Sequence, residues 1–316
     1  MNELYPLIEP YAAYLLDVDG GHRVYVEECG NPEGLPVVYL HGGPGSGCRS
    51  FHRRFFNPAK YRIILLDQRG AGRSLPAGST ENNSTPHLIG DLEAIRARLQ
   101  IDHWLIYGGS WGSTLGLLYA QAHPERVTGM VLRGSFLARQ RDLDWFIGDG
   151  VRRIYPERWA EFMAAMPAEA SHDVIGALHG LLLGADELAQ RRAAKAWTLW
   201  SEQIAQGSGF EASDLDKQQP AVMLQKARIE LHYARNRYFI EEDQILRHCE
   251  CLQHLPVILI HGRRDLVCPM EAAFCLKQAL PQAEYWALPD SGHLPVGEEM
   301  IDALVRATDL MADRLG

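Results

Sequence analysis

A serine flanked by glycines stands where a strand-like run gives way to a helix-like one. Ser110 lies in the segment GGSWG of residues 108–112, which fits G-x-S-x-G, after the apolar run 104–107 and before a helical stretch from Thr114 to Gln121. Glycines two residues to either side allow the sharp turn that lifts a serine hydroxyl out of a sheet edge. The N–H groups and dipole at the start of the following helix favour negative charge there. Ser110 is therefore a candidate nucleophile in need of a base.

A base and an orienting carboxylate follow two later strand-like runs. A serine nucleophile needs a histidine that accepts its proton and a carboxylate that orients the histidine. Asp265 lies just past the apolar run 256–260, and His293 follows the run 284–288 in the segment PDSGH. Loops after parallel strands gather at one edge of a sheet, so these side chains are expected to meet there. The order Ser, Asp, His is that of the α/β-hydrolases.

A glycine-rich segment upstream supplies the remaining element of such a site. Residues 41–45, HGGPG, follow the first buried run, residues 37–40. Their backbone can present an N–H to the oxyanion of a tetrahedral intermediate, together with the N–H of Trp111. Each residue on its own also has a structural explanation. Asp265 could cap a helix or stand in a turn, and His293 could be a surface histidine. His41 is expected to support its loop. Four elements in the right order, each at the end of a predicted strand, favour a catalytic site.

The elements that must position these residues can be predicted from short apolar runs. Such runs, flanked by Gly, Pro or Asp, are typical of buried parallel strands. They alternate with helical segments through the first part of the chain, after an N-terminal hairpin around residues 19–21. Strand, helix, strand order implies right-handed crossovers and a doubly wound sheet. From about residue 137 to 248 no strand-like run occurs, and strand character returns at residue 256.

We therefore predict an α/β fold of three segments. Residues 1–136 form the first part of the core with the nucleophile, residues 137–248 an inserted all-helical cap, and residues 249–316 the second part of the core with Asp265 and His293. The central sheet is mostly parallel and carries helices on both faces.

Bulk composition excludes several classes of protein. A net charge of −9 argues against a nucleic-acid footprint or a basic membrane-binding face. No apolar run approaches the roughly 18 residues that span a bilayer. The first residues lack the features of a secretory signal, which predicts a cytoplasmic protein. Six scattered cysteines are then expected to be free thiols. The pair Cys249 and Cys251 is too tightly spaced for a zinc knuckle, so no metal site is predicted.

The chain resembles the proline iminopeptidases, or prolyl aminopeptidases, in six segments spread over the predicted core. These are LYP at 4–6, EECGNP at 27–32, HGGPG at 41–45, DQRGAGRS at 67–74, GGSWGS at 108–113 and HPERV at 123–127.

The resemblance implies an α/β-hydrolase fold with a helical cap and a defined activity. The activity is that of a serine peptidase that releases an N-terminal proline from a small peptide through an acyl-enzyme, without a metal or organic cofactor. Motif matches make Ser110 the nucleophile, Asp265 the orienting carboxylate and His293 the general base. The N–H groups of Gly43 and Trp111 match the oxyanion hole.

The resemblance also implies glutamates in the cap that bind the substrate's terminal amine. One lies in an Arg-Ile-Glu-x-His-Tyr motif, which places Glu230 in this role. The alternative interpretation is that Glu230 is a solvated glutamate on a helix face. The other family glutamate directly follows a tryptophan. Here Ser201 follows Trp200, and Glu202 comes one place later. A shift of one residue turns a helical side chain by about 100°, so Glu202, the matching substrate-binding candidate, reaches the site only if the helix adjusts.

For the proline ring, the family match indicates Phe136, with Val267 and Cys268 beside the aspartate. An aromatic face and small apolar groups suit a five-membered ring, although Phe136 could equally be a core residue. The altered Trp-Glu pair leaves a second hypothesis open, an esterase or amidase of the same fold that acts on small uncharged acyl substrates. A non-catalytic binding protein is disfavoured because all the catalytic elements are present.

Overall fold

Eight strands form a single sheet in a computed structural model of the chain, which describes residues 2–211 and 213–316. The order across the sheet is β1-β2-β4-β3-β5-β6-β7-β8. β1 and β2, and β2 and β4, pair antiparallel, whereas every later pair is parallel. The strands are β1 (Ala12–Asp17), β2 (Arg23–Gly30), β3 (Leu35–Leu40), β4 (Tyr61–Asp67), β5 (Trp104–Gly109), β6 (Val127–Arg133), β7 (Val257–Gly262) and β8 (Glu284–Leu288). The predicted hairpin and the mostly parallel sheet are thus confirmed.

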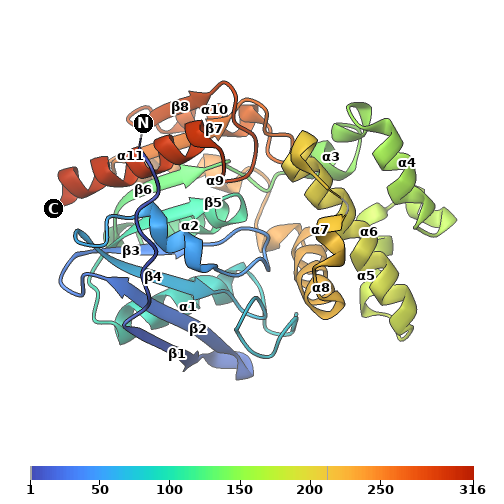
Figure 1. Cartoon of the computed structure of the whole chain (residues 1–316), viewed down its shortest axis with the longest axis horizontal. Coiled ribbons are helices and arrows are strands. Elements are labelled where there is room, and N and C mark those ends of the chain that lie inside the picture. Colours follow the sequence, from blue (N-terminus) through green and yellow to red (C-terminus); the bar gives the residue numbers. More distant parts are fainter. Residues whose placement is uncertain (1, 212) are drawn as a thin grey trace.

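Helices cover both faces of this sheet, and further helices gather at one side of it (Figure 1). They are α1 (Thr85–Arg98), α2 (Trp111–Ala122), α3 (Gln140–Ile147), α4 (Pro156–Ala164), α5 (Val174–Leu183), α6 (Glu187–Gln206), α7 (Ser213–Asp216), α8 (Pro220–Arg235), α9 (Gln244–Arg247), α10 (Met270–Ala279) and α11 (Glu298–Leu315).

The burial of both faces explains why the central strands β3 and β5 are apolar along most of their length. Successive side chains point to opposite faces of a sheet. Val38 and Leu40 of β3 pack in the cluster that contains α1, α2 and α10, whereas Val37 and Tyr39 pack in the cluster that contains α11. Because helices cover both faces, neither set can be polar. The central strand β5 is consequently buried along its whole length.

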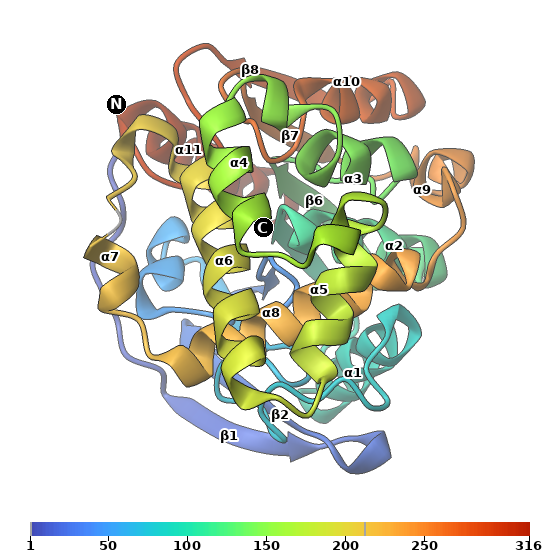
Figure 2. The same cartoon turned by 90° about the vertical axis from the view of Figure 1, so that its right-hand side faces the viewer.

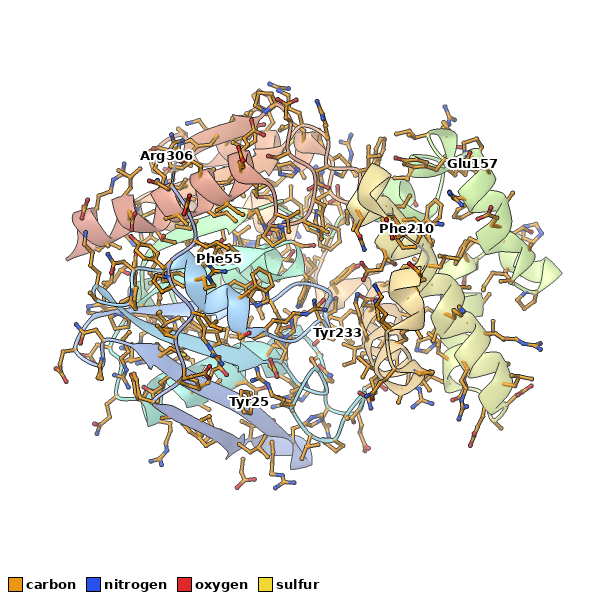
Figure 3. All side chains as sticks on the ribbon, viewed as in Figure 1. Tyr25, Phe55, Glu157, Phe210, Tyr233 and Arg306 are labelled. Atoms are coloured by element: carbon orange, nitrogen blue, oxygen red, sulfur yellow. The ribbon has the colours of Figure 1, made fainter. Side chains whose placement is uncertain are left out.

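The described elements between residues 137 and 248 are all helical, as the sequence predicts. A third apolar cluster, with Trp197 and Trp200 of α6 and Leu178 of α5, joins α4, α5, α6 and part of α8. Seen from that side, α6 passes in front of α8, which lies closer to the sheet (Figure 2). Tyr233 of α8 lies where these helices meet the rest of the molecule (Figure 3), and its hydroxyl donates to Asn83 Oδ1 at 2.8 Å. The domain boundaries themselves stay a prediction.

The strand order reverses in the middle of the sheet. From β3 the chain crosses to β4 on one side, and it returns to β5 on the other side of β3. Ligand sites of open α/β sheets lie at such a switch point, beyond the carboxyl ends of the strands. Leu40 at the end of β3 pairs with Gly108 near the end of β5. The loop that follows β3 and the turn that carries Ser110 are therefore neighbours.

Within residues 2–211 and 213–316, no helix is both long enough and apolar enough to cross a membrane.

Gly112 fixes how closely α2 approaches β3, and its replacement tests this packing. A Cβ atom at position 112 would lie 2.0 Å from the carbonyl oxygen of Leu40. We expect Gly112→Ala to lower the free energy of unfolding by about 3 kcal/mol or more, because backbone must move to admit the methyl group. Urea unfolding curves with a common slope measure the change.

The matched control is Gly90→Ala, at an exposed position of α1 where an added Cβ would meet nothing within 4 Å. This variant is expected to gain up to about 1 kcal/mol from its higher helix propensity. Equal stability of the two variants would contradict the close approach of α2 to β3.

Candidate active site

The turn between β5 and α2 holds Ser110 in a strained backbone conformation. Ser110 has φ 56° and ψ −125°, outside the regions that residues with a side chain ordinarily occupy. Its N–H donates to the carbonyl oxygen of Arg133 at 2.9 Å, which fixes the turn against β6. A Cβ at Gly108 would lie 2.3 Å from the carbonyl oxygen of Gly112, so the two motif glycines let the strand and helix fold back upon each other. Strain maintained in this way is typical of functional positions.

Asp265 and His293 form a buried hydrogen-bonded pair on the loops that follow β7 and β8. His293 Nδ1 lies 2.8 Å from Asp265 Oδ2. The other carboxylate oxygen accepts from the N–H groups of Val267 at 2.9 Å and Cys268 at 2.8 Å. An ionised carboxylate only accepts hydrogen bonds, so Nδ1 carries the proton and Nε2 of His293 is left as the acceptor.

The charge state of Asp265 follows from its surroundings. Burial on its own raises the pKa of a carboxyl group. Here the charge and hydrogen bond of His293, with the nearby His261, outweigh burial and lower the pKa of Asp265 below its usual value. His261 Nε2 lies 2.8 Å from the carbonyl oxygen of Cys268 and 3.5 Å from Asp265 Oδ2, and burial lowers its pKa. Asp265 is thus an anion that faces two imidazoles.

Arg133 and Gly134 link this pair to the serine. The Arg133 carbonyl accepts from Ser110 N, and its guanidinium donates to the carbonyl oxygen of His293. A Cβ on the next residue, Gly134, would lie 3.3 Å from Asp265 Oδ2 and 3.5 Å from the His293 ring. In the described chain, Ser110 Oγ makes no hydrogen bond with His293, and it lies 4.0 Å from Cys268 Sγ. Such bonds are often long without substrate and tighten in the complex.

The HGGPG loop lies directly against Ser110. A Cβ on Gly42 would be 3.4 Å from Ser110 Cβ and 3.9 Å from its Oγ. Trp111 is the first residue of α2, so its N–H has no acceptor within the helix. Among the described residues, the N–H of Gly43 donates to no other group. The N–H groups of Gly43 and Trp111 are thus both free to bind an oxyanion, and their role as the oxyanion hole stays a prediction.

A chain of buried hydrogen bonds joins this loop to Trp111 through Gln68. His41 Nδ1 donates to the carbonyl oxygen of Gly42 at 2.8 Å, and His41 Nε2 accepts from Gln68 N at 2.9 Å. The Gln68 amide donates to the carbonyl oxygen of His41 at 2.9 Å and accepts from the Trp111 indole N–H at 2.8 Å. Burial lowers the pKa of His41, which keeps the ring neutral as this pattern demands. His41 thus supports the loop, as the sequence analysis expected.

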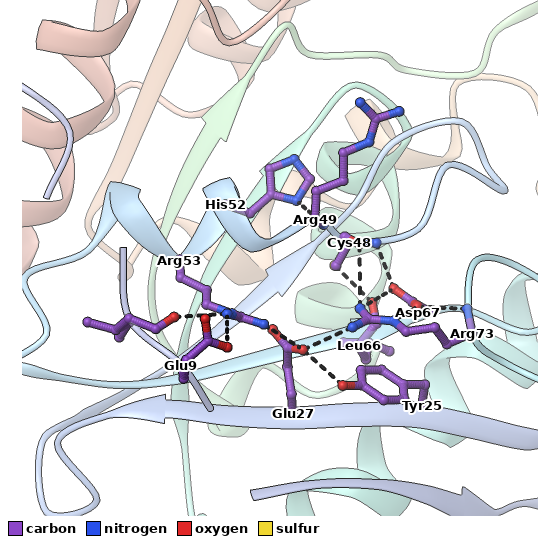
Figure 4. Close-up of polar contacts among 11 residues, drawn as sticks. Glu9, Tyr25, Glu27, Cys48, Arg49, His52, Arg53, Leu66, Asp67 and Arg73 are labelled. Atoms are coloured by element: carbon purple, nitrogen blue, oxygen red, sulfur yellow. Dashed lines mark hydrogen bonds and ion pairs between the residues drawn. The ribbon is translucent and has the colours of Figure 1, made fainter. Parts of the chain in front are cut away.

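A buried ion network fixes the far end of the same loop (Figure 4). Asp67, at the end of β4, accepts from Cys48 N at 2.6 Å and from Arg73 Nε at 2.7 Å. Glu27 of the antiparallel strand β2 accepts from Arg53 Nε at 2.8 Å and Arg73 Nη1 at 3.1 Å. Removing one partner of such a network leaves a buried charge uncompensated, typically at a cost of about 3–5 kcal/mol. The family segment at residues 67–74 therefore anchors the loop at residues 41–48.

Two carboxylates of the helical region lie side by side around a lysine. Glu230 Oε2 accepts from the Trp197 indole N–H at 2.6 Å. Lys226 Nζ lies 3.8 Å from Glu230 Oε1 and 3.5 Å from Glu202 Oε1. Glu202 thus lies beside the same cation as Glu230 despite the one-residue shift, because α6 crosses α8 at an angle that brings both carboxylates to Lys226. Burial raises the pKa of Glu230, and the charge of Lys226 opposes this rise.

Aromatic rings connect this cluster to the serine. The Tyr238 ring lies 5.4 Å from the Trp111 ring and 5.0 Å from the Phe136 ring. Burial raises the pKa of Tyr238, and the nearby charge of Glu230 raises it further. Phe136 is half-buried, and its backbone is held by Ser113 and Thr114 at the start of α2. Phe136 is therefore partly exposed while the rest of its ring packs on the core, and its backbone is fixed to the first turn of α2.

Cys268 and Val267 also lie where the sequence analysis placed them. Cys268 is buried against Ser110, and burial, followed by the charge of Asp265, raises the pKa of its thiol well above the usual value. A thiol that stays protonated is a poor nucleophile, so Cys268 acts as an apolar wall. Val267 is half-buried and packs at the edge of the cluster formed by α4, α5 and α6.

Comparison with known proteins identifies the family. Residues 36–299 match the family model described as the alpha/beta hydrolase fold. The curated proline iminopeptidase of Xylella fastidiosa (strain Temecula1) is 46% identical over 313 residues, which cover 98% of this chain and 99% of the relative. That of Neisseria meningitidis serogroup A is 44% identical over 308 residues, 97% of this chain and 98% of the relative.

This chain belongs to the proline iminopeptidase family. Solved structures with lower identity share its fold. The esterase RhEst1 from Rhodococcus sp. ECU1013 superposes with a TM-score of 0.64 at 22% identity, covering 96% of this chain and 99% of the esterase. Among the described residues of this proline iminopeptidase family member, no group of three or more His, Cys, Asp or Glu side chains is placed to hold a metal ion.

Several residues around the site were not found from the sequence. Arg133 and Tyr238 occur in no segment that the resemblance singled out, and Lys226 precedes the RIELHY segment without belonging to it. Gln68 does lie in such a segment, so its position in the motif could have marked it as part of the site. The motif alone does not predict that the Gln68 side chain accepts a hydrogen bond from the Trp111 indole.

Gln68 offers a test of how the N–H donors are positioned. Gln68→Met keeps the side-chain volume but leaves the His41 carbonyl and the Trp111 indole without their partner. We expect the second-order rate of Ser110 phosphonylation by a fluorophosphonate to fall about 10- to 100-fold, somewhat less than the loss of a whole oxyanion donor. Unfolding should become about 1–3 kcal/mol easier because buried polar groups lose their bonds.

Gln282→Met is the matched control, since the Gln282 amide also donates to two carbonyl oxygens, those of Leu252 and Leu255, but does so far from Ser110. Its phosphonylation rate should equal that of the unaltered protein. A normal rate in Gln68→Met would show that Gln68 only stabilises the fold.

Proposed function

We propose that this protein is a serine aminopeptidase that releases an N-terminal proline from small peptides. The observation that carries the proposal is the Asp265–His293 pair, joined at 2.8 Å and linked through Arg133 and Gly134 to the strained Ser110. Membership of the proline iminopeptidase family supports the choice of substrate. The net charge of −9 speaks against nucleic acid as a partner.

In the proposed reaction, Ser110 Oγ attacks the prolyl carbonyl carbon as its proton passes to Nε2 of His293. The N–H groups of Gly43 and Trp111 stabilise the oxyanion, and Asp265 stabilises the imidazolium. The intermediate collapses to a prolyl-serine ester when His293 protonates the departing amine. Water then hydrolyses this ester with His293 again as the base. The substrate draws Ser110 and His293 into hydrogen-bond contact.

Substrate selection in this proposal belongs to Glu230 and Glu202. Proline at a peptide's amino terminus carries a secondary ammonium, and carboxylates at a fixed distance from Ser110 place the first peptide bond at the nucleophile. Trp197 orients Glu230 through the 2.6 Å hydrogen bond. Phe136, Val267 and Cys268 supply the apolar surface for the ring. The Phe136 backbone is bonded to Ser113 and Thr114 just after Ser110, and the N–H groups of Val267 and Cys268 donate to Asp265.

Loss of the nucleophile tests the chemistry. Ser110→Ala should lower kcat for prolyl 4-nitroanilide by at least about 10⁴-fold, because residues of a triad act as a unit. Release of nitroaniline is followed spectrophotometrically, and phosphonylation of the unaltered protein confirms the labelled residue by peptide mass. Turnover by Ser110→Ala at the original rate would refute the proposal.

Loss of the amine anchor tests the substrate. Glu230→Gln should raise KM for prolyl 4-nitroanilide about 10- to 100-fold, the value of a hydrogen bond to a charged group, with a smaller effect on kcat. N-acetylprolyl 4-nitroanilide, which lacks the charge, should bind the variant as well as before.

Glu241→Gln is the control, because Glu241 is exposed and pairs with Arg247 at 2.7 Å away from these groups. An unchanged KM in Glu230→Gln would favour the alternative, an esterase or amidase that acts on uncharged acyl groups.

A further inference from the structure

A cation of the protein itself occupies the space between the two carboxylates that would hold the substrate's amine. Lys226 Nζ lies 3.5 Å from Glu202 Oε1 and 3.8 Å from Glu230 Oε1. Each carboxylate uses its second oxygen for a neutral donor, the Trp197 indole at 2.6 Å for Glu230 and the Gln206 amide at 3.0 Å for Glu202. The ammonium is therefore the sole positive partner that either carboxylate has in the described chain.

The lysine is at the site and is not a distant surface residue. Its side chain is 25% exposed, and those of Glu202 and Glu230 are 23% and 12% exposed. A Cβ on Gly45 of the HGGPG loop would lie 3.3 Å from the carbonyl oxygen of Lys226 and 3.3 Å from Ile229 Cβ. The turn of α8 that carries Lys226 thus rests on the loop whose N–H groups face the oxyanion.

The charges around Lys226 keep it protonated. The carboxylate of Glu230 raises its pKa, with Glu202 adding to the effect, while burial and the positive charge of Arg49 oppose it. Two carboxylates and one ammonium leave a net charge of about −1 in the cluster. An incoming substrate ammonium therefore meets carboxylates that already have a partner of its own chemical kind.

We propose that Lys226 is an internal substitute for the substrate's terminal ammonium, which a charged substrate displaces and a neutral substrate leaves in place. This inference rests on the proposed function, since it presumes that Glu202 and Glu230 bind the amine. Its consequence is reduced discrimination: Lys226 weakens binding of free-amine substrates and lets the site accept acyl groups that bring no charge.

The physical reason is the cost of unpaired like charges in a partly buried site. Without Lys226, Glu202 and Glu230 would face each other without a cation, which like-charge repulsion and desolvation both disfavour. A bound ammonium relieves the repulsion between the two carboxylates. A neutral ligand excludes water from them without supplying a charge, and so increases that repulsion. Removing the lysine should therefore strengthen binding of the charged ligand and weaken binding of the neutral one.

The experiment uses two compounds of nearly the same shape. Prolyl 4-nitroanilide carries the ring ammonium, and cyclopentanecarbonyl 4-nitroanilide has a methylene group in its place. Two constants are measured at low ionic strength: KM of the prolyl compound, and Ki of the carbocyclic compound as a competitive inhibitor. The quantity compared between variants is the ratio of this Ki to this KM. We expect Lys226→Met to raise this ratio at least about tenfold, mostly through a lower KM, with kcat within about a factor of two.

Lys226→Arg keeps a cation and should leave the ratio near its original value. Lys60→Met changes the net charge equally at the exposed pair with Asp313 and should leave it unchanged. If Lys226→Met does not fold, Lys226→Gln serves instead, with normal phosphonylation of Ser110 as proof of an intact site.

The outcomes separate the two proposals. Absence of any turnover of prolyl 4-nitroanilide by the unaltered protein refutes the proposed function and this inference with it. If the unaltered protein turns over prolyl 4-nitroanilide but Lys226→Met leaves the ratio of Ki to KM unchanged or lowers it, only the proposed role of Lys226 is overturned. A higher KM for prolyl 4-nitroanilide in Lys226→Met would also overturn it, and would mean that the lysine holds the glutamates in place for the substrate.

Discussion

The contact between the first turn of α2 and the end of β3 is the constraint on which the site depends. Gly112 passes so close to the Leu40 carbonyl that no side chain fits between them. This contact brings two loops from neighbouring strands together at the switch point of the sheet, one with Ser110 and the other with Gly43. Ser110 and the N–H groups proposed to stabilise an oxyanion there are therefore held by one junction of the backbone. Backbone packing, rather than side-chain flexibility, sets their separation, which is how preorganised electrostatic sites are built.

Around this junction, polar groups act mainly as spacers. Gln68 links His41 to Trp111, Asp67 ties the loop end at Cys48, and Arg133 reaches from the turn to the backbone of His293. None of these side chains needs to touch a substrate. Each satisfies buried backbone or indole groups that would otherwise be left without partners, and in doing so it fixes a distance between two loops.

The sequence predicts those features that depend on local patterns. Apolar runs of strand length, glycines around Ser110 and the order of Asp265 and His293 each follow from short-range rules, and the sheet and the Asp265–His293 pair agree with them. The helix α3 falls within the segment predicted to be helical, but neither its bounds nor those of α10 were predicted individually. The arrangement of Glu202 beside Glu230 depends on how α6 crosses α8, and no local pattern encodes that angle. For the same reason the sequence did not reveal that Lys226 lies between them.

The helix α8 belongs to two apolar clusters at once. Ile229 and Tyr233 pack with the sheet, whereas Ala227 and Leu231 pack with α5 and α6. Glu230 and Lys226 therefore stand on a helix that is packed on both sides, whereas Trp197 and Glu202 stand on α6, whose buried apolar residues belong to the third cluster. Because Glu230 and Glu202 stand on different helices, an ammonium bound by both would bridge α8 and α6, so that recognition of a peptide end would also strengthen the packing of one helix on the other.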